Sequence, residues 1–124
     1  DKLVTGVQTC ALPIFAKGWV TALQFDTLLA GSNIADTLYY QICRYAITEA
    51  MRLKETLLAK GYTMPVDSFT NQQFVEVSLE QAAMLKQHIT YGEWEPPRGN
   101  KVTIRLATSW ATDPKDVDRL IELL

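Results

Sequence analysis

The stretch KVTIRLAT, residues 101–108, places an apolar side chain at every second position. The apolar positions are Val102, Ile104 and Leu106. The positions between them are Thr103, Arg105 and Ala107. Because successive side chains of an extended chain point to opposite faces, this alternation predicts a β-strand with one face in a hydrophobic core. The fold must therefore contain a sheet with a buried face, and the flanking segments indicate what covers it.

A helix is expected to follow this strand. Asp113 is a suitable N-cap, and Pro114 stands at the first helical position, where its missing N–H is not needed. The apolar residues after it recur at helical spacing, and they are Val117, Leu120, Ile121 and Leu124. Such a stripe predicts an amphipathic helix that packs on the sheet.

Another strand and another helix are expected before this strand. Residues 73–77 alternate in the same way, which predicts a strand. Ser78, with Gln81 three positions later, forms a capping box that predicts a helix over residues 79–87. Shorter extended segments are expected at residues 62–68 and 89–94.

Two helices are expected near the beginning of the chain. The first covers residues 15–30 and ends at Gly31, which is expected to form a left-handed cap, and the second begins at Ser32 or Asn33 and ends at Gly61. The apolar stripe of the second helix is Ala35, Leu38, Ile42, Ala46, Ala50, Leu53 and Leu57. A helix of nearly thirty residues spans about 40 Å, which is more than a small domain needs for itself. We therefore expect this helix to expose apolar side chains.

The predicted order of elements is typical of an α+β fold, in which a small antiparallel or mixed sheet is covered by helices and preceded by a long helix. A chain of 124 residues, 48% apolar and 21% charged, forms one domain. Its net charge of -2 offers no electrostatic footprint for nucleic acid or an anionic membrane, and no apolar run could span a bilayer. The two cysteines do not indicate a disulfide framework, so we expect a cytoplasmic protein.

Residues 4–14, VTGVQTCALPI, differ from the rest of the chain. They show neither helical nor strand periodicity, and Pro13 would end any element. They also lack the basic and apolar regions of a signal peptide. The segment resembles the translation of a common sequencing adapter. We therefore interpret residues 1–14 as a non-native tail and residues 15–124 as the domain, with a genuine disordered tail as the alternative.

Arg105 is the first candidate for a binding residue. A guanidinium on a central strand loses hydration and requires an anionic partner in good geometry. That partner is either an internal Asp or Glu, which would make Arg105 a structural ion pair, or the carboxylate of a ligand. The residue pattern alone leaves both possibilities open.

Four further residues are candidates for the lining of a pocket, namely Asn71, Gln72, Ser109 and Trp110. Amide side chains in a turn between strands suit a polar ligand, although they are also ordinary turn residues. A tryptophan beside a turn can form a pocket wall or the edge of a core. His88 follows the end of a predicted helix, where it is expected to be a C-terminal cap. Nothing in the sequence resembles a phosphate-binding loop or a cluster of metal ligands.

Six short phrases of the sequence resemble those of one known family. They are AKG (16–18), LQFDTL (23–28), LYY (38–40), TNQQF (70–74), WE (94–95) and IRLATSWAT (104–112). Their order and spacing resemble the C-terminal part of the threonine aldolase and β-eliminating lyase family, in its low-specificity threonine aldolase branch. The resemblance covers residues 15–124.

The resemblance implies a pyridoxal phosphate enzyme of the aspartate-aminotransferase fold, with an amino acid as substrate and a homo-oligomeric assembly. In this family a lysine of the large domain binds the cofactor as a Schiff base, so that the cofactor acts as an electron sink. That lysine would lie before Phe15, and Lys17 resembles a lysine that follows it. The resemblance therefore implies that the cofactor domain is missing and that this chain has no catalytic, cofactor-binding or metal-binding residue.

Under this resemblance, Arg105 matches the arginine that binds the α-carboxylate of the substrate. The implied reaction is cleavage of a β-hydroxy amino acid, such as threonine to glycine and acetaldehyde. Ser109 and Trp110 stand where the best-known aldolases have a histidine and an aspartate, and Trp19 replaces an expected arginine. Two alternatives remain: β-elimination on an aromatic amino acid, and a non-catalytic α+β interaction module.

Overall fold

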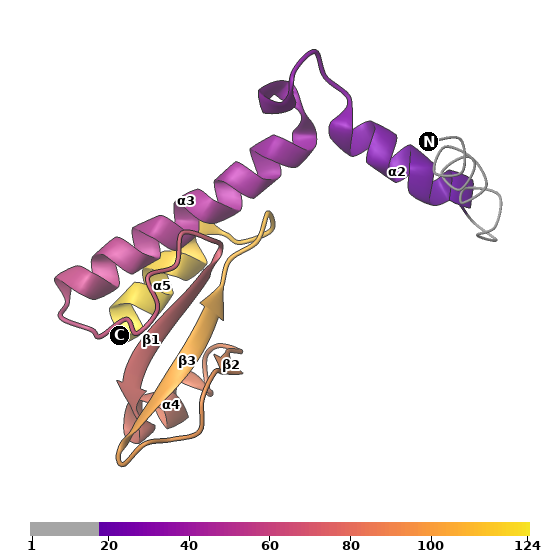
Figure 1. Ribbon diagram of the computed structural model, residues 1–124. Coiled ribbons are helices and arrows are strands. Elements are labelled where there is room, and N and C mark those ends of the chain that lie inside the picture. Colours follow the sequence, from indigo (N-terminus) through magenta and orange to yellow (C-terminus); the bar gives the residue numbers. More distant parts are fainter. Residues whose placement is uncertain (1–17) are drawn as a thin grey trace. The chain divides into compact units, whose positions relative to one another are not determined.

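The computed structural model describes residues 18–124. The predicted non-native tail and Lys17 lie outside the described residues. The chain divides into two units, one ending at Gln41 and the other covering Ile42–Leu124. The elements are labelled in Figure 1, which shows a sheet and three helices in the second unit.

The first unit contains helix α2, Gly18–Leu29, and the short 3-10 helix η1, Ile34–Asp36. The prediction of one helix from Ser32 or Asn33 to Gly61 is wrong, because the chain leaves the helical path at Thr37. The Asn33 side chain caps η1 by accepting a hydrogen bond from the N–H of Ala35 at 2.8 Å. Side chains that bond to the local backbone in this way compete with a continuous helix.

Helix α3, Leu38–Ala59, begins at Thr37, whose hydroxyl oxygen accepts a hydrogen bond from the N–H of Tyr40 at 3.2 Å. It ends in a Schellman motif, in which the N–H of Tyr62 donates to the carbonyl of Leu57 at 3.0 Å. Gly61 adopts the left-handed conformation that this motif requires, with φ of 86°. The predicted stop at Gly61 is therefore confirmed. Gly31 has no positive φ, so its predicted left-handed cap is wrong.

The sheet has three antiparallel strands in the order β1-β3-β2. Strand β1 is Gln72–Ser78, β2 is Gly92–Glu93 and β3 is Lys101–Ala107. The prediction that β3 is central is confirmed. Residues 62–68, which were expected to be extended, form no strand and contribute only the bridge between Thr63 and Glu76. Pro65 lies beside that bridge and has no N–H to continue a ladder.

Helices α4, Leu79–Leu85, and α5, Pro114–Leu123, begin at the predicted caps. Ser78 and Gln81 form both hydrogen bonds of the capping box. The Asp113 side chain accepts a hydrogen bond from the N–H of Lys115 at 2.9 Å. Both sequence signals are therefore confirmed.

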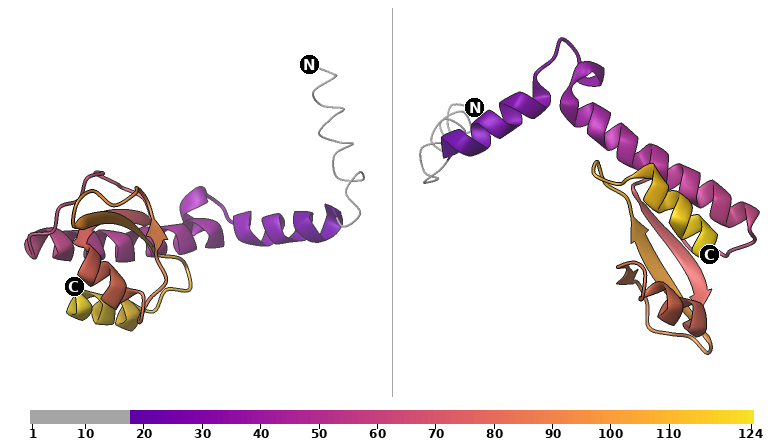
Figure 2. Two further views of the ribbon diagram at one scale, coloured as in Figure 1. Left: turned by 90° about the horizontal axis from the view of Figure 1, so that it is seen from below. Right: turned by 180° about the vertical axis from the view of Figure 1, so that it is seen from behind.

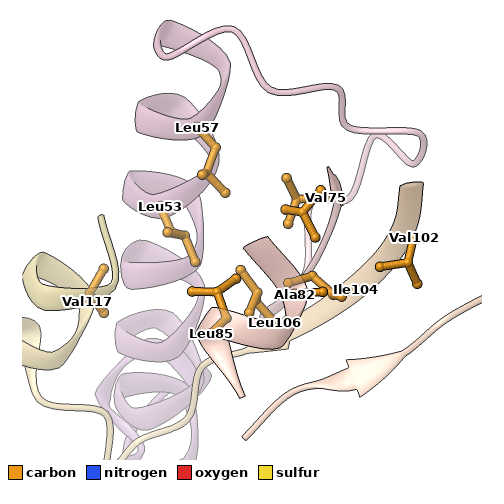
Figure 3. Close-up of a cluster of buried hydrophobic side chains, with 10 residues drawn as sticks. Leu53, Leu57, Val75, Ala82, Leu85, Val102, Ile104, Leu106 and Val117 are labelled. Carbon is orange, nitrogen blue, oxygen red and sulfur yellow. The ribbon is translucent and has the colours of Figure 1, made fainter. Parts of the chain in front are cut away.

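The hydrophobic core lies between one face of the sheet and helices α3, α4 and α5. Its buried residues are Leu53, Leu57, Val75, Val77, Ala82, Leu85, Val102, Ile104, Leu106 and Val117. Figure 3 shows nine of them converging from the helices and the two long strands. Helix α5 runs beside α3 in Figures 1 and 2. The predicted α+β fold, with helices on one side of an antiparallel sheet, is confirmed.

Both early helices expose apolar side chains. On α3 the exposed ones are Leu38, Tyr39, Tyr40, Ile47 and Leu58. On α2 they are Trp19, Leu23, Phe25 and Leu29. The expectation that the long helix exposes apolar surface is therefore confirmed. Within residues 18–124, no helix is both long enough and apolar enough to cross a membrane.

Candidate functional site

Arg105 lies on the central strand and points away from the hydrophobic core. Its neighbours along β3, Ile104 and Leu106, are buried in that core, so the alternation of the strand places Arg105 on the opposite face. In the sheet register Arg105 pairs with Phe74 of β1 on one side and with Gly92 of β2 on the other. Three strands thus position the guanidinium.

The side chain of Arg105 extends over Gly92. A Cβ atom added at Gly92 would lie 3.2 Å from both Nε and Nη2 of Arg105 and 3.5 Å from its Cζ. The guanidinium therefore occupies the space that a side chain at position 92 would need.

An aromatic pair lies on the same face as Arg105. Phe74 and Trp94 meet edge to face, with ring centroids 4.7 Å apart and an interplanar angle of 62°. The N–H of Trp94 donates a hydrogen bond to the carbonyl of Thr103 at 3.0 Å, which holds Trp94 beside β3. Thr103 is only 9% exposed, although it lies on the face opposite the core. The face therefore combines a cation with an apolar wall.

Arg105 is exposed, so the expectation of a desolvated guanidinium is not met in this chain. The core helices α3, α4 and α5 pack on the opposite face of the sheet, so they do not bury Arg105. The ion pairs of the described region involve Arg52, Lys54, Lys86, Arg98 and Lys101. Among residues 18–124, no Asp or Glu lies within ion-pair distance of Arg105. The internal ion pair that the sequence left open is therefore not found in the described region.

A pocket of about 340 Å³ lies elsewhere in the second unit. It is lined by Ile42, Cys43, Ala46, Ile47, Phe69, Thr70, Asn71, Ser109 and Trp110. Three of the four predicted lining residues, Asn71, Ser109 and Trp110, are thus brought together. Gln72, the first residue of β1, does not line it. Arg105 does not line it either.

Hydrogen bonds fix the polar rim of this pocket. The Asn71 side-chain amide donates to the carbonyl of Thr108 at 2.7 Å. The Thr108 hydroxyl donates to the carbonyl of Ala46 on α3 at 2.6 Å. The turn before β1 and the loop after β3 are therefore held against α3, and the amide of Asn71 has a structural partner.

The lining of this pocket does not fit pyridoxal phosphate. The pocket lining contains no Lys or Arg that could hold a phosphate group. Four of the described lysines are engaged elsewhere: Lys54, Lys86 and Lys101 pair with carboxylates, and Lys60 donates to the carbonyl of Ile121 at 2.5 Å. We therefore assign no cofactor-binding residue in this region, and no step through the cofactor.

His88 lies just beyond the end of α4. Its backbone N–H donates to the carbonyl of Leu85 at 2.9 Å, within the turn that closes the helix. The C-cap of α4 is Lys86, so the prediction that His88 is the C-terminal cap is wrong.

Sequence reasoning did not single out Gly92 or Phe74. A glycine within a segment expected to be extended indicates that another group approaches the backbone closely, and this signal was present at Gly92. Phe74 had no such signal, because its position opposite Arg105 depends on the register of β1 with β3. Cys43 and Phe69 line the pocket because the fold brings α3 to the turn before β1.

In comparisons with known proteins, no protein-family model and no curated protein matches the chain. Among solved structures, a threonine aldolase from Leishmania major is similar, with 30% sequence identity and a TM-score of 0.79 over 89% of this chain. A serine palmitoyltransferase from Sphingomonas wittichii is similar in fold, with 16% identity and a TM-score of 0.52 over 64% of this chain.

The chain spans only part of these enzymes, 31% of the threonine aldolase and 23% of the serine palmitoyltransferase. The second likeness concerns the fold alone, whereas the first extends to the sequence. The predicted resemblance to the threonine aldolase family is therefore confirmed, and this chain is similar in both sequence and fold to a segment of such an enzyme.

Proposed function

We propose that this chain is the C-terminal segment of a pyridoxal phosphate-dependent lyase, in which Arg105 binds the α-carboxylate of an amino-acid substrate. The reaction is cleavage of the Cα–Cβ bond of a β-hydroxy amino acid, such as threonine to glycine and acetaldehyde. The likeness to the threonine aldolase from Leishmania major supports the reaction class. The cofactor, which supplies an electron sink, is held by the remainder of the enzyme.

The observation that carries this proposal is the state of Arg105. It lies in the central strand, faces away from the core, and has no carboxylate within ion-pair distance in residues 18–124. A guanidinium presents two parallel N–H donors that match the two oxygens of a carboxylate. A guanidinium that extends from a central strand and has its two parallel N–H donors unpaired within residues 18–124 is therefore suited to an anionic ligand.

The residues of this chain act by positioning. Arg105 holds the carboxylate, and a carboxylate held by two hydrogen bonds fixes the orientation of the substrate's Cα. Phe74 and Trp94 form an apolar wall on the same face as the guanidinium, which a substrate side chain could contact.

The experiment compares Arg105→Ala and Arg105→Lys in the full-length enzyme that contains this chain. Loss of a charge-assisted pair costs about 1.5–3 kcal/mol, so kcat/KM for L-threonine should fall about 10- to 100-fold in Arg105→Ala. In Arg105→Lys, kcat/KM should fall less, because lysine keeps the positive charge but lacks the two parallel N–H donors of the guanidinium. Arg119→Ala, which removes an exposed arginine of α5, is the matched control. Equal kcat/KM in Arg105→Ala and the control would refute the role of Arg105.

A second candidate reaction is β-elimination on an aromatic amino acid. The observation that favours it is the Phe74–Trp94 pair beside Arg105, because aromatic side chains stack well on such a wall. The product distinguishes the two reactions. Threonine cleavage yields glycine and acetaldehyde, whereas elimination releases an aromatic leaving group. If neither product appears with the full-length enzyme, the non-catalytic module is the better interpretation.

We further propose that the 124-residue chain is inactive by itself, that the full-length enzyme is a homo-oligomer, and that it is cytoplasmic. Inactivity is supported by the lining of the pocket beside Asn71, which contains no Lys or Arg that could hold a phosphate group. Incubation of the chain with pyridoxal phosphate and L-threonine should form no glycine. Glycine formation would contradict this part of the proposal.

A further inference from the structure

Gly92 occupies the edge strand directly beside Arg105. Strand β2 pairs with β3 so that Gly92 is opposite Arg105, and Glu93 is opposite Ile104. A glycine weakens a strand because it has more conformational freedom to lose and no side chain to pack. A strand as short as β2, Gly92–Glu93, gains nothing in stability from this residue.

The backbone does not require glycine at this position. Among residues 18–124, the glycines with positive φ are Gly61 and Gly99, and Gly92 is not one of them. Any L-residue could adopt the backbone conformation of Gly92 without strain. The reason for glycine must therefore be the space where its side chain would be.

That space is filled by the guanidinium of Arg105. An added Cβ would lie 3.2 Å from Nε, 3.2 Å from Nη2 and 3.5 Å from Cζ. No atom of any other residue is among the three nearest to that Cβ. A side chain at position 92 would therefore mainly displace the guanidinium of Arg105, which carries the hydrogen-bond donors.

We propose that Gly92 is a positioning residue for Arg105: its missing side chain lets the guanidinium extend across β2 on the open face of the sheet. This inference rests on the proposed function, in which the guanidinium binds the substrate's α-carboxylate. Gly92 itself touches no substrate and acts only through Arg105. A substitution at position 92 shifts the carboxylate site without removing the charge.

Substitutions at Gly92 should move affinity and stability in opposite directions. Alanine and valine both suit a strand better than glycine, so the thermal midpoint of unfolding should stay equal or rise. Alanine forces the guanidinium to shift by tenths of an ångström, and valine forces a larger shift. Since a misplacement of about 1 Å can cost about 100-fold, KM for L-threonine should rise about threefold in Gly92→Ala and about tenfold or more in Gly92→Val. A residue with a merely structural role would lose stability and activity together.

The experiment is a double-mutant cycle in the full-length enzyme with L-threonine as substrate. KM and kcat are measured for Gly92→Val, Arg105→Ala and the double variant, together with the thermal midpoint of each. If Gly92 acts through Arg105, its substitution has no further effect once the guanidinium is absent. The double variant should therefore equal Arg105→Ala in KM.

The outcomes separate this inference from the proposed function. If Arg105→Ala leaves KM unchanged, the proposed function fails. If Arg105→Ala raises KM but Gly92→Val does not, only the role of Gly92 is overturned. An effect of Gly92→Val that persists in the Arg105→Ala background, or that accompanies a lower thermal midpoint, also overturns it.

Discussion

Asn71 and Thr108 are joined by hydrogen bonds in both directions, one donated by the Asn71 side chain and two donated to the Asn71 carbonyl by the N–H and the hydroxyl of Thr108, the latter at 3.3 Å. The side-chain amide of Asn71 donates to the carbonyl of Thr108 at 2.7 Å, and the N–H of Thr108 donates to the carbonyl of Asn71 at 3.0 Å. The pair extends the contact between β1 and β3 beyond the last residues of the ladder, Gln72 and Ala107. It thereby fixes one end of the sheet against the pocket rim.

Substitution of Asn71 should destabilise the second unit. Asn71→Ala removes the side-chain bond to Thr108 but leaves the backbone bond, so the free energy of unfolding should fall by about 1 kcal/mol. Urea denaturation followed by far-UV circular dichroism measures this change. Gln72→Ala is the matched control, since the Gln72 side chain makes no hydrogen bond within residues 18–124. Equal losses in both variants would show that the Asn71 amide contributes no specific stability.

Two adjacent leucines of α3 should respond differently to truncation. Leu57 is 0% exposed and belongs to the core cluster, whereas Leu58 is 50% exposed. Leu57→Ala should lower the free energy of unfolding by about 2–5 kcal/mol, because it leaves a cavity. Leu58→Ala should change it by less than about 0.5 kcal/mol. The same urea experiment compares them, and a Leu58 effect as large as that of Leu57 would mean that α3 packs through its other face.

Much of the fold could be predicted because its signals are local. The capping box of Ser78 and Gln81, the Asp113 cap and the stop at Gly61 each depend on a few neighbouring residues. The break at Thr37 could not be found from periodicity, because the apolar residues on both sides of it keep helical spacing. It depends on competition from side-chain hydrogen bonds, which a hydrophobic pattern does not report.

The candidate site was only partly predictable, for a related reason. Arg105 was found because it places a charged side chain on a strand whose alternation marks it as part of the sheet. The exposure of Arg105 was not predicted, because the burial of the sheet face opposite the core depends on whether another element packs on it. Gly92 acquires its importance only from the register of β2 with β3, which pairs it with Arg105. Such a pairing between residues distant in sequence is set by tertiary structure.

Gly61 should tolerate asparagine better than alanine. Its φ of 86° is a left-handed conformation that costs an alanine about 1 kcal/mol, whereas asparagine adopts it more readily. A side chain at this position meets no atom within 4 Å, so sterics do not add to the cost. Gly61→Ala should therefore lower the thermal midpoint more than Gly61→Asn. The reverse order would show that the end of α3 changes conformation on substitution.

Arg52 should matter more to stability than its partner Asp118. Both Nε and Nη2 of Arg52 donate to Oε2 of Glu49, at 3.1 and 2.8 Å, and Nη1 donates to Asp118 at 2.5 Å. The Glu49 side chain is 11% exposed and that of Asp118 is 58% exposed. Removing Arg52 leaves a largely buried carboxylate without its partner, so Arg52→Met should cost about 1–3 kcal/mol. Asp118→Asn should cost less than about 1 kcal/mol.

The same ion pairs lead to a prediction of how the stability cost of Asp118→Asn depends on pH. The hydrogen bond to Asp118, followed by that to Glu49, raises the pKa of the Arg52 guanidinium above its ordinary value. A raised folded-state pKa stabilises the fold at every pH below the ordinary pKa of the unfolded guanidinium, and this stabilisation is lost only above it. The cost of Asp118→Asn should therefore be constant between about pH 6 and pH 9. A cost that disappears towards pH 9 would mean that another group is responsible.

The exposed apolar side chains of α2 should make the chain self-associate. Trp19 is 73% exposed, Phe25 59% and Leu23 58%, and apolar groups clustered on one helix promote association in water. Sedimentation velocity of the 124-residue chain should show a sedimentation coefficient that rises with concentration. Phe25→Glu should reduce this dependence, because it replaces an apolar contact with a charge.

Thr27→Glu is the matched control for that variant. Thr27 is exposed on the same helix, so the substitution adds the same charge without removing an apolar side chain. If association is driven by apolar surface, Thr27→Glu should sediment almost as the unsubstituted chain does, while Phe25→Glu approaches a monomer. Equal effects of the two variants would mean that net charge controls association. A chain that stays monomeric at about 100 μM would mean that the apolar side chains of α2 are too dispersed to drive it.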